Sequence, residues 1–342
     1  MSIPIIDISP LHILETTPES ASEDPSVVAV IQQISSACQS YGFFAITNHG
    51  VSPSLISTAC NESMAFFDLD KSLKEEVSMS DDYPYGYENY ESLGTECANR
   101  STDSTHVTSG IDFKETFSIG PLHESSGMPP RRLPSKRISF NAALTNYYSA
   151  MESLSQTLFR GFAVALKLDP NWFLQKGVFD TSHQCALRVL NYPALEFSDT
   201  VIRAGAHTDY GAMTILYSGG PGLQLCLSSD GRDWIDVPHL EGAFIINLGD
   251  LMQRWTNDQW RSTLHRVVAV ANDECNGGDS NNALVFRSER RHSIAFFVNI
   301  NGQAKVVPFE SCVDENHPVR YKEILASEHL MQRHLRSMGK LN

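Results

Sequence analysis

The chain has 342 residues, of which 42% are hydrophobic, enough for a substantial buried core. Its 40 acidic residues outnumber its 26 lysines and arginines, so the formal net charge is -14. An acidic surface repels phosphate backbones and anionic lipids, which argues against nucleic acid and membrane partners.

The first part of the chain alternates strand-like and helical patterns. Residues 3–8 are a short apolar run that predicts a buried strand, and apolar side chains recur at helical spacing over residues 26–41. Residues 41–47 predict a second strand, which ends in the turn signal Asn48-His-Gly50. A second helical pattern covers residues 53–69.

A polar stretch follows. Residues 76–110 are low in aliphatic side chains and predict a long surface excursion. The tyrosine cluster from Tyr83 to Tyr90 within it is either a lid over a substrate or a simple solvated loop. Residues 138–168 then return to helical periodicity.

The second half of the chain is rich in short β-like runs separated by Gly, Asn, Asp and Pro clusters. The runs cover residues 185–192, 213–217, 234–237, 243–247, 265–270, 283–286 and 293–300. Many short runs in close succession predict a sandwich or barrel and not βαβ units. The tail, residues 319–338, has a helical pattern.

Cysteine usage and hydropathy indicate the compartment. The seven cysteines are widely spread without a Cys-x-x-Cys pair, which is typical of free thiols in a reducing environment. No segment approaches the roughly 18 apolar residues that span a bilayer, and no signal-peptide pattern opens the sequence. We therefore expect a cytoplasmic monomer.

Two histidines and an aspartate have the spacing of a metal site. His207 and Asp209 stand at positions i and i+2, so on a strand their side chains would share one face. A third ligand must come from another strand, and His265 begins one of the β-rich runs. Two imidazoles and one carboxylate leave positions open, which is typical of oxygen-activating iron(II), although zinc and manganese accept the same donors. The competing pair His239-Leu-Glu241 lies at an expected strand end, a poorer platform.

An Arg-x-Ser pair downstream adds a site for a carboxylate. Arg291 and Ser293 would share one strand face, where the guanidinium fork and the hydroxyl can both donate to carboxylate oxygens. A similar pair, Arg137-Ile-Ser139, precedes the metal residues in a basic, proline-flanked loop. The ordered set of His-x-Asp, a distal His and Arg-x-Ser across β-like runs is much rarer than its parts, so it indicates one site.

With these motifs, the sequence resembles the isopenicillin N synthase-like branch of the 2-oxoglutarate- and iron(II)-dependent dioxygenases. The resemblance follows the family's order over nearly the whole chain. The matching stretches are Ile3–Asp7, Tyr41–Gly50, Asp112–Phe117, Leu187–Pro193, Ala206–Gly211, Phe244–Asp250, Arg254–Asn257, Ser262–Val267 and Arg291–Phe297.

The resemblance implies a mainly β fold with flanking α-helices, built on a distorted double-stranded β-helix (jelly-roll) core. It implies an N-terminal dioxygenase region of helices and strands over residues 1–120 and a helical connection over residues 121–180. The jelly-roll core that binds Fe(II) and 2-oxoglutarate would cover residues 181–310, and a helical tail residues 311–342.

The resemblance also implies the residues of the site, with no catalytic side chain beyond the metal ligands. The expected iron ligands are His207, Asp209 and His265. The expected 2-oxoglutarate contacts are Arg291, Ser293, Tyr192 and Asn191. The candidate substrate contacts are Phe117, Arg203 and Phe297. Asn247, Gly249 and Asp250 lie on an expected strand-turn and are expected to be structural.

The implied activity is that of an oxidoreductase in specialised metabolism. It would use Fe(II), 2-oxoglutarate and O2 to oxidise an unactivated C–H bond of a small molecule, by hydroxylation, desaturation or oxidative cyclisation. The alternative is an isopenicillin N synthase-type oxidase that uses O2 without 2-oxoglutarate, in which Arg291 and Ser293 would hold a substrate carboxylate. The intact ligand set argues against a metal-free binding module on the same scaffold. The sequence does not identify the substrate.

Overall fold

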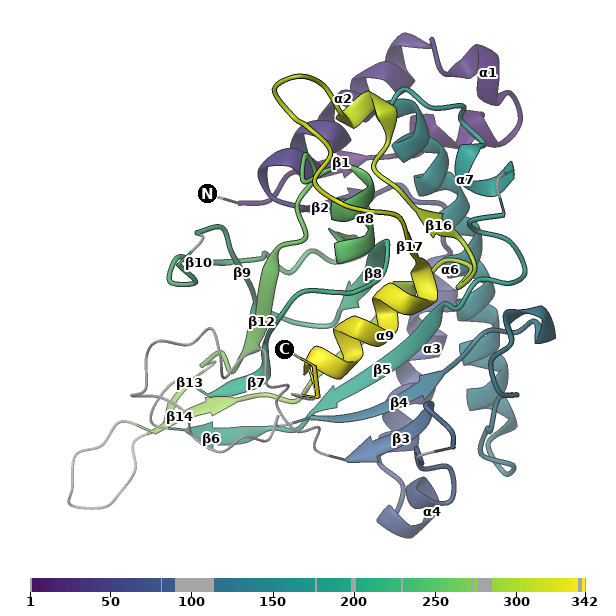
Figure 1. The fold of residues 1–342 in the computed structure, drawn as a ribbon. Coiled ribbons are helices and arrows are strands. Elements are labelled where there is room, and N and C mark those ends of the chain that lie inside the picture. The colour runs from purple at the N-terminus through teal and green to yellow at the C-terminus, as the bar shows by residue number, and fades with distance from the viewer. Residues whose placement is uncertain are drawn as a thin grey trace.

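Two β-sheets packed face to face form the centre of the computed structural model, and helices cover the outer face of the larger sheet (Figure 1). The structure describes residues 2–80, 82–89, 114–175, 177–197, 201–228, 230–271, 273–275, 285–337 and 340–341.

The larger sheet has eight strands. Their order is β1 (Ile5–Asp7), β2 (Phe43–Thr47), β11 (Phe244–Leu248), β8 (Met213–Ser218), β15 (Arg291–Val298), β5 (Ala186–Tyr192), β4 (Glu115–Ile119) and β3 (Gly86–Asn89). The facing sheet has four strands, in the order β10 (Trp234–Asp236), β9 (Leu223–Cys226), β12 (Leu264–Val268) and β7 (Ile202–His207). This is the jelly-roll core that the resemblance implied, as two open sheets and not a closed barrel. The strand-like runs predicted from the sequence did not include β3, β4, β7 or β9, although the metal-site prediction assumed a strand at His207.

Two small sheets and the helices complete the described part. The small sheets are β13 (Asp273–Cys275), β14 (Val285–Ser288) and β6 (Leu195–Phe197), and β16 (Lys305–Val306) with β17 (Ile324–Leu325). The helices are η1 (Ser9–Glu15), α1 (Pro18–Ala21), α2 (Pro25–Ser40), α3 (Pro53–Phe67), α4 (Lys71–Glu75), η2 (Glu124–Ser126), α6 (Ile138–Ala165), α7 (Trp172–Gln175), α8 (Asp250–Trp255), η3 (Glu310–Cys312) and α9 (Ala326–Ser337). The last helix starts later than the predicted tail helix.

The middle of the larger sheet is buried on both faces, which explains why strands such as β2 and β11 are nearly continuous apolar runs. Successive side chains of a strand point to opposite faces. Phe44 and Ile46 of β2 therefore pack into the core under α2, α3 and α6, while Phe43 and Ala45 pack into a second core between the two sheets. A polar side chain that points into the space between the sheets is shielded from bulk water, so it can contact a ligand bound there.

The polar stretch that starts at residue 76 is not one surface excursion. β3 joins the larger sheet beside β4, and Tyr83, Tyr85 and Tyr87 are buried, at most 6% exposed. The lid prediction and the solvated-loop alternative are therefore both wrong for these three tyrosines, because their rings pack inward. Tyr87 Oη donates to Glu115, and Tyr83 Oη accepts from the backbone N–H of Arg132. Tyr90 and the rest of the stretch lie outside the described residues.

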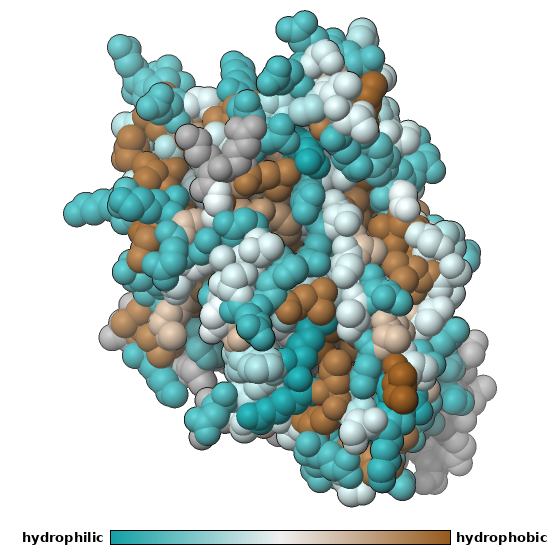
Figure 2. Space-filling view, turned by 90° about the vertical axis from the view of Figure 1, so that its right-hand side faces the viewer, coloured by the Kyte–Doolittle hydropathy of each residue, from teal (hydrophilic) through white to brown (hydrophobic). Residues whose placement is uncertain are grey.

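Figure 2 shows the helical side of the molecule, where hydrophobic residues form separate patches among hydrophilic ones. Individual exposed hydrophobic side chains of this kind are normal on globular proteins. Among the described residues, no helix combines the length and the hydrophobicity needed to cross a bilayer.

Candidate active site

The three predicted metal ligands meet at one end of the space between the sheets. His207 is the last residue of β7, and His265 of β12 is its cross-strand partner. Asp209 lies beyond the end of β7, so a turn positions it, and not the strand face that the sequence predicted. The Nε2 atoms of His207 and His265 lie 3.7 and 3.9 Å from Asp209 Oδ1. All three ligand atoms lie within 4.8 Å of one another.

The backbone sets the orientation of both imidazole rings. His207 Nδ1 lies 2.7 Å from the carbonyl oxygen of Gly205, and His265 Nδ1 lies 3.0 Å from that of Thr263. A carbonyl oxygen only accepts, so each Nδ1 carries the proton and each Nε2 keeps a free lone pair. Partial desolvation between the sheets and the neighbouring His265 lower the pKa of His207, which keeps the ring neutral and able to bind a metal.

Asp209 is held by two hydrogen bonds to one of its oxygens. Thr214 Oγ1 and Asn247 Nδ2 donate to Oδ2 at 2.5 and 2.6 Å, and their strands pair so that the two residues lie opposite each other. Burial raises the pKa of Asp209, but His265, His207 and these two hydrogen bonds together lower it by more. The net pKa is therefore below the usual range. The carboxylate is therefore ionised, with Oδ1 left to face the histidines.

This donor set fits iron(II). It offers two neutral imidazole nitrogens and one carboxylate oxygen, and each donor has its second atom engaged elsewhere, as is usual for metal ligands. The side chain of His207 is 40% exposed, whereas those of Asp209 and His265 are 8% and 9% exposed. The site is therefore open on the His207 side, where further ligands can approach an ion.

The C-terminal helix α9 braces the turn that carries Asp209 (Figure 1). Arg333 Nη2 donates to Thr208 Oγ1 at 2.9 Å, and its Nε lies 2.6 Å from Asp250 Oδ2 in an ion pair. The guanidinium also lies 5.2 Å from the centre of the Tyr210 ring. Residues on both sides of Asp209 are thereby tied to one arginine.

Arg291 and Ser293 also lie between the sheets, at the start of β15. Arg291 is 5% exposed, and its fork donates to the Gly220 carbonyl, to Ser218 Oγ and, at 3.5 Å, to Ser293 Oγ. Its guanidinium lies 4.9 Å from the centre of the Tyr192 ring. Burial lowers the pKa of Arg291, but at neutral pH the group stays charged. The structure thus brings three of the four predicted cosubstrate residues together.

The fourth, Asn191, does not join them. It directly precedes Tyr192 on β5, so its side chain points to the opposite face of the sheet. There Asn191 donates to Glu115 at 2.7 Å and accepts from Arg290 at 2.7 Å. Its place is in a polar network outside the sheet sandwich, and the prediction that it contacts 2-oxoglutarate is not supported.

The three candidate substrate residues separate in the same way. Phe117 is fully buried in the core outside the larger sheet, where its ring packs against Phe66 and Phe140, so it cannot contact a ligand between the sheets. Phe297 faces the other core and is the cross-strand partner of Thr214, which donates to Asp209. Phe297 therefore lies on the face that carries the metal site.

Arg203, the third candidate, lies beside Tyr192. It is 1% exposed, and its guanidinium is 5.8 Å from the centre of that ring. Its position at the start of β7 places it four residues before His207, about 13 Å away along a strand. The structure therefore groups it with Arg291 and not with the metal ligands.

Several residues of the site were not identified from the sequence. Thr214 was not considered, Asn247 was expected to be structural, and nothing singled out Arg333. The available signal was a polar residue among apolar neighbours within a strand, which describes Asn247 in β11 and Thr214 in the apolar first half of β8. A buried polar side chain requires a partner, so such positions are candidates for supporting a ligand.

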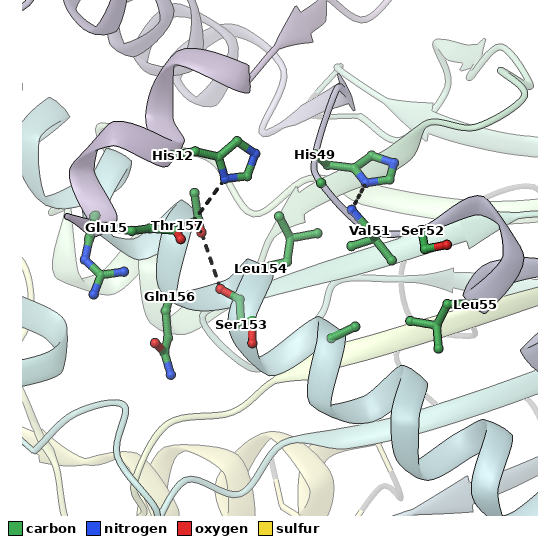
Figure 3. Close-up of a pocket in the computed structure, with 13 residues that line it drawn as sticks. His12, Glu15, His49, Val51, Ser52, Leu55, Ser153, Leu154, Gln156 and Thr157 are labelled. Carbon is green, nitrogen blue, oxygen red and sulfur yellow. Dashed lines mark hydrogen bonds and ion pairs between the residues drawn. The ribbon is translucent and has the colours of Figure 1, made fainter.

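A surface groove of about 680 Å³ lies elsewhere, between η1, the turn before α3 and α6 (Figure 3). Its lining includes His12, Glu15 and His49, but none of the metal or cosubstrate candidates. His49 bridges two backbone segments, because its Nε2 donates to Gly242 O and its Nδ1 accepts from the N–H of Val51. These contacts give it a structural role.

Comparisons with known proteins agree with this site. Residues 3–136 match the family model described as non-haem dioxygenase in morphine synthesis N-terminal, and residues 183–300 match that of the 2OG-Fe(II) oxygenase superfamily. Homoarginine-6-hydroxylase 2-ODD-233 of Oryza sativa subsp. japonica is 30% identical over 340 residues, which cover 97% of this chain and 96% of the relative. The 2-oxoglutarate-dependent dioxygenase traH of Penicillium crustosum is 34% identical over 252 residues, 70% of this chain and 73% of the relative.

A solved structure gives the same result. A full-length Neurospora crassa protein, crystallised in complex with alpha-KG, has a TM-score of 0.77 to this chain at 27% identity, over 97% of this chain and 95% of that one. The sequence match, the fold and the His-Asp-His cluster agree. The chain therefore belongs to the 2-oxoglutarate- and iron(II)-dependent dioxygenases, oxidoreductases whose cofactors are Fe(II), 2-oxoglutarate and O2.

Proposed function

We propose that the enzyme oxidises an unactivated C–H bond of a small molecule of specialised metabolism, with hydroxylation as the first outcome to test. The observation that carries the proposal is the pairing of an open His207-Asp209-His265 cluster with a buried arginine in the same space between the sheets. One end can hold a metal, and the other can hold the far carboxylate of an elongated cosubstrate.

The protein's own residues provide position and charge. His207, Asp209 and His265 would hold iron(II) through Nε2, Oδ1 and Nε2, because their other polar atoms are engaged. Bound iron(II) and 2-oxoglutarate supply the oxygen activation and the oxidising power.

Arg291 and Ser293 would donate to the distal carboxylate of 2-oxoglutarate, with Tyr192 beside them. Phe297 would line the substrate side of the metal site, since its cross-strand partner Thr214 donates to Asp209. The apolar side chains between the sheets would keep water from the reacting atoms on that side, while the His207 side stays open to ligands.

The activities of relatives suggest which substrates to test first. Four relatives at 28–30% identity are homoarginine-6-hydroxylases, and a structural neighbour was solved with thymine. A first panel would hold homoarginine, arginine, lysine and thymine.

Coupled turnover is the test. Enzyme with Fe(II), ascorbate and 2-oxoglutarate is supplied with each compound, and succinate and oxidised product are measured together. We expect one succinate per product and, for hydroxylation, one oxygen atom from labelled O2 in the product. Asp209→Ala should abolish both signals, whereas Asp236→Ala, a change at an exposed strand residue, should not.

Product formed without consumption of 2-oxoglutarate would instead favour the isopenicillin N synthase-type oxidase. That alternative is not favoured, because traH and a second relative, caaD, are both named 2-oxoglutarate-dependent dioxygenases.

We further propose a cytoplasmic monomer. The five cysteines whose side chains the structure describes are free and buried, which suits a reducing compartment. Light scattering of the purified protein checks the monomer, and localisation of a tagged chain checks the compartment.

A further inference from the structure

Arg203 is a buried cation without an acidic partner among the described residues. Its guanidinium donates to the carbonyl oxygens of Pro193 and Glu289 and to Ser288 Oγ, and its Nε has no partner there. The Glu289 carboxylate is 59% exposed and pairs with Arg287 instead. Burying a guanidinium with only neutral partners is costly, so a position of this kind calls for an anion.

A second such cation lies next to it. Arg291 is also bonded only to hydroxyl and carbonyl groups in the described part of the chain. Both guanidiniums contact the ring of Tyr192, at 4.9 Å for Arg291 and 5.8 Å for Arg203. Burial, and then the charge of Arg291, lower the pKa of Arg203 to about 10. Two positive charges thus repel each other across one aromatic ring.

The hydrogen-bond partners of Arg203 lie next to the expected cosubstrate residues in the sequence. Pro193 directly follows Tyr192, and Ser288 and Glu289 precede Arg291. The guanidinium therefore links β7 to the end of β5 and to the start of β15, while it lies against the Tyr192 ring. A change at Arg203 would loosen both residues that face the cosubstrate.

We propose that Arg203 is a positioning residue for the distal carboxylate of 2-oxoglutarate, which it serves by fixing Tyr192 and Arg291 and by supplying a second positive charge behind them. The inference rests on the proposed cosubstrate role of Arg291. It replaces the expectation that Arg203 contacts the substrate, since Arg203 lies about 13 Å along β7 from His207. The distal carboxylate of the cosubstrate then provides a negative charge beside both arginines, which have no acidic partner among the described residues.

Ligand binding to the anaerobic Fe(II) enzyme tests the proposal, followed through the charge-transfer absorption of the 2-oxo acid chelate. The two probes are 2-oxoglutarate and 2-oxopentanoate, which has the same chain length but no distal carboxylate. In Arg203→Met we expect the Kd of 2-oxoglutarate to rise by about tenfold or more, because Tyr192 and Arg291 are no longer fixed and a nearby positive charge is lost, while that of 2-oxopentanoate changes less than about twofold. We expect kcat at saturating 2-oxoglutarate to change little.

Three further variants make the result decisive. Arg203→Lys keeps the charge without the fork, so it should recover part of the affinity. Arg287→Gln, at an exposed arginine near the same turn, should bind both probes normally. Equal weakening of both probes in Arg203→Met, or no change in either, would overturn the proposal. If Arg203→Met does not fold, the same comparison in Arg203→Lys decides, because a loss confined to 2-oxoglutarate supports the proposal and equal or absent losses reject it. Normal 2-oxoglutarate binding in Arg291→Leu would instead refute the role of Arg291 itself.

Discussion

Asn247 offers a direct test of how the metal site is built. Its Nδ2 donates to Asp209 Oδ2 at 2.6 Å, and the two side chains belong to residues that are 2% and 7% exposed. Asn247→Leu keeps a similar volume but removes the donor, so Oδ2 retains only the hydrogen bond from Thr214. The carboxylate can then rotate, and Oδ1 is no longer held toward the two histidines.

The expected size of the effect follows from the type of contact. A buried hydrogen bond to a charged group contributes about 1.5–3 kcal/mol, and loss of such an outer partner weakens metal binding by about 10–100-fold. We therefore expect the Kd of Fe(II) to rise by about 10–100-fold in Asn247→Leu. The free energy of unfolding of the metal-free protein should fall by about 1–3 kcal/mol.

Anaerobic Fe(II) titration and urea unfolding of the same preparations separate these two effects. Asn257→Ala is the matched control, because Asn257 is also 2% exposed but donates to the backbone carbonyls of residues 312, 317 and 318, away from the metal. It should lose stability and keep its iron affinity. An Asn247→Leu protein that is destabilised but binds Fe(II) normally would refute the reasoning, since the hydrogen bond would then not orient the ligand.

Three more predictions concern the rest of the site. Arg291→Leu should raise the KM for 2-oxoglutarate by about 100-fold, because two charged contacts are lost, and an unchanged 2-oxoglutarate dependence of succinate release would contradict this. Arg333→Met should weaken Fe(II) binding several-fold and make α9 more sensitive to protease, since the ion pair to Asp250 and the hydrogen bond to Thr208 both disappear; unchanged titration and proteolysis would exclude the brace. Burial, together with Arg254 and Arg333, lowers the pKa of His329 from 6.5 to about 4, so this ring is neutral in the fold and charged in the unfolded chain between those values. The free energy of unfolding should therefore fall as the pH falls from about 6.5 toward 4, by up to about 3 kcal/mol, and it should fall less in His329→Leu. Urea unfolding at pH 7 and pH 5 measures the loss in each protein. An equal loss in the two proteins would reject this account.

The sequence by itself determined the positions of most core strands and the types of side chain that can bind the metal. The strands of the core are apolar runs bounded by turn residues, so most could be located, and the donor types of His207, Asp209 and His265 indicated the metal before any contact was known. Both inferences depend only on residue type and short spacing. The strand-face argument for Asp209 reached the right residue for the wrong reason, because β7 ends at His207 and a turn places the carboxylate.

Only the tertiary structure decided which side chains face the site, because this depends on strand register and packing. Asn191 and Tyr192 are neighbours in sequence but face opposite sides of the sheet, since side chains alternate along a strand. Phe117 and Phe297 are alike in sequence, yet one packs under the helices and the other faces the second sheet. Thr214, Asn247 and Arg333 support the metal turn from three distant segments. No local pattern encodes such a meeting, because it arises only when separate strands and the last helix pack together.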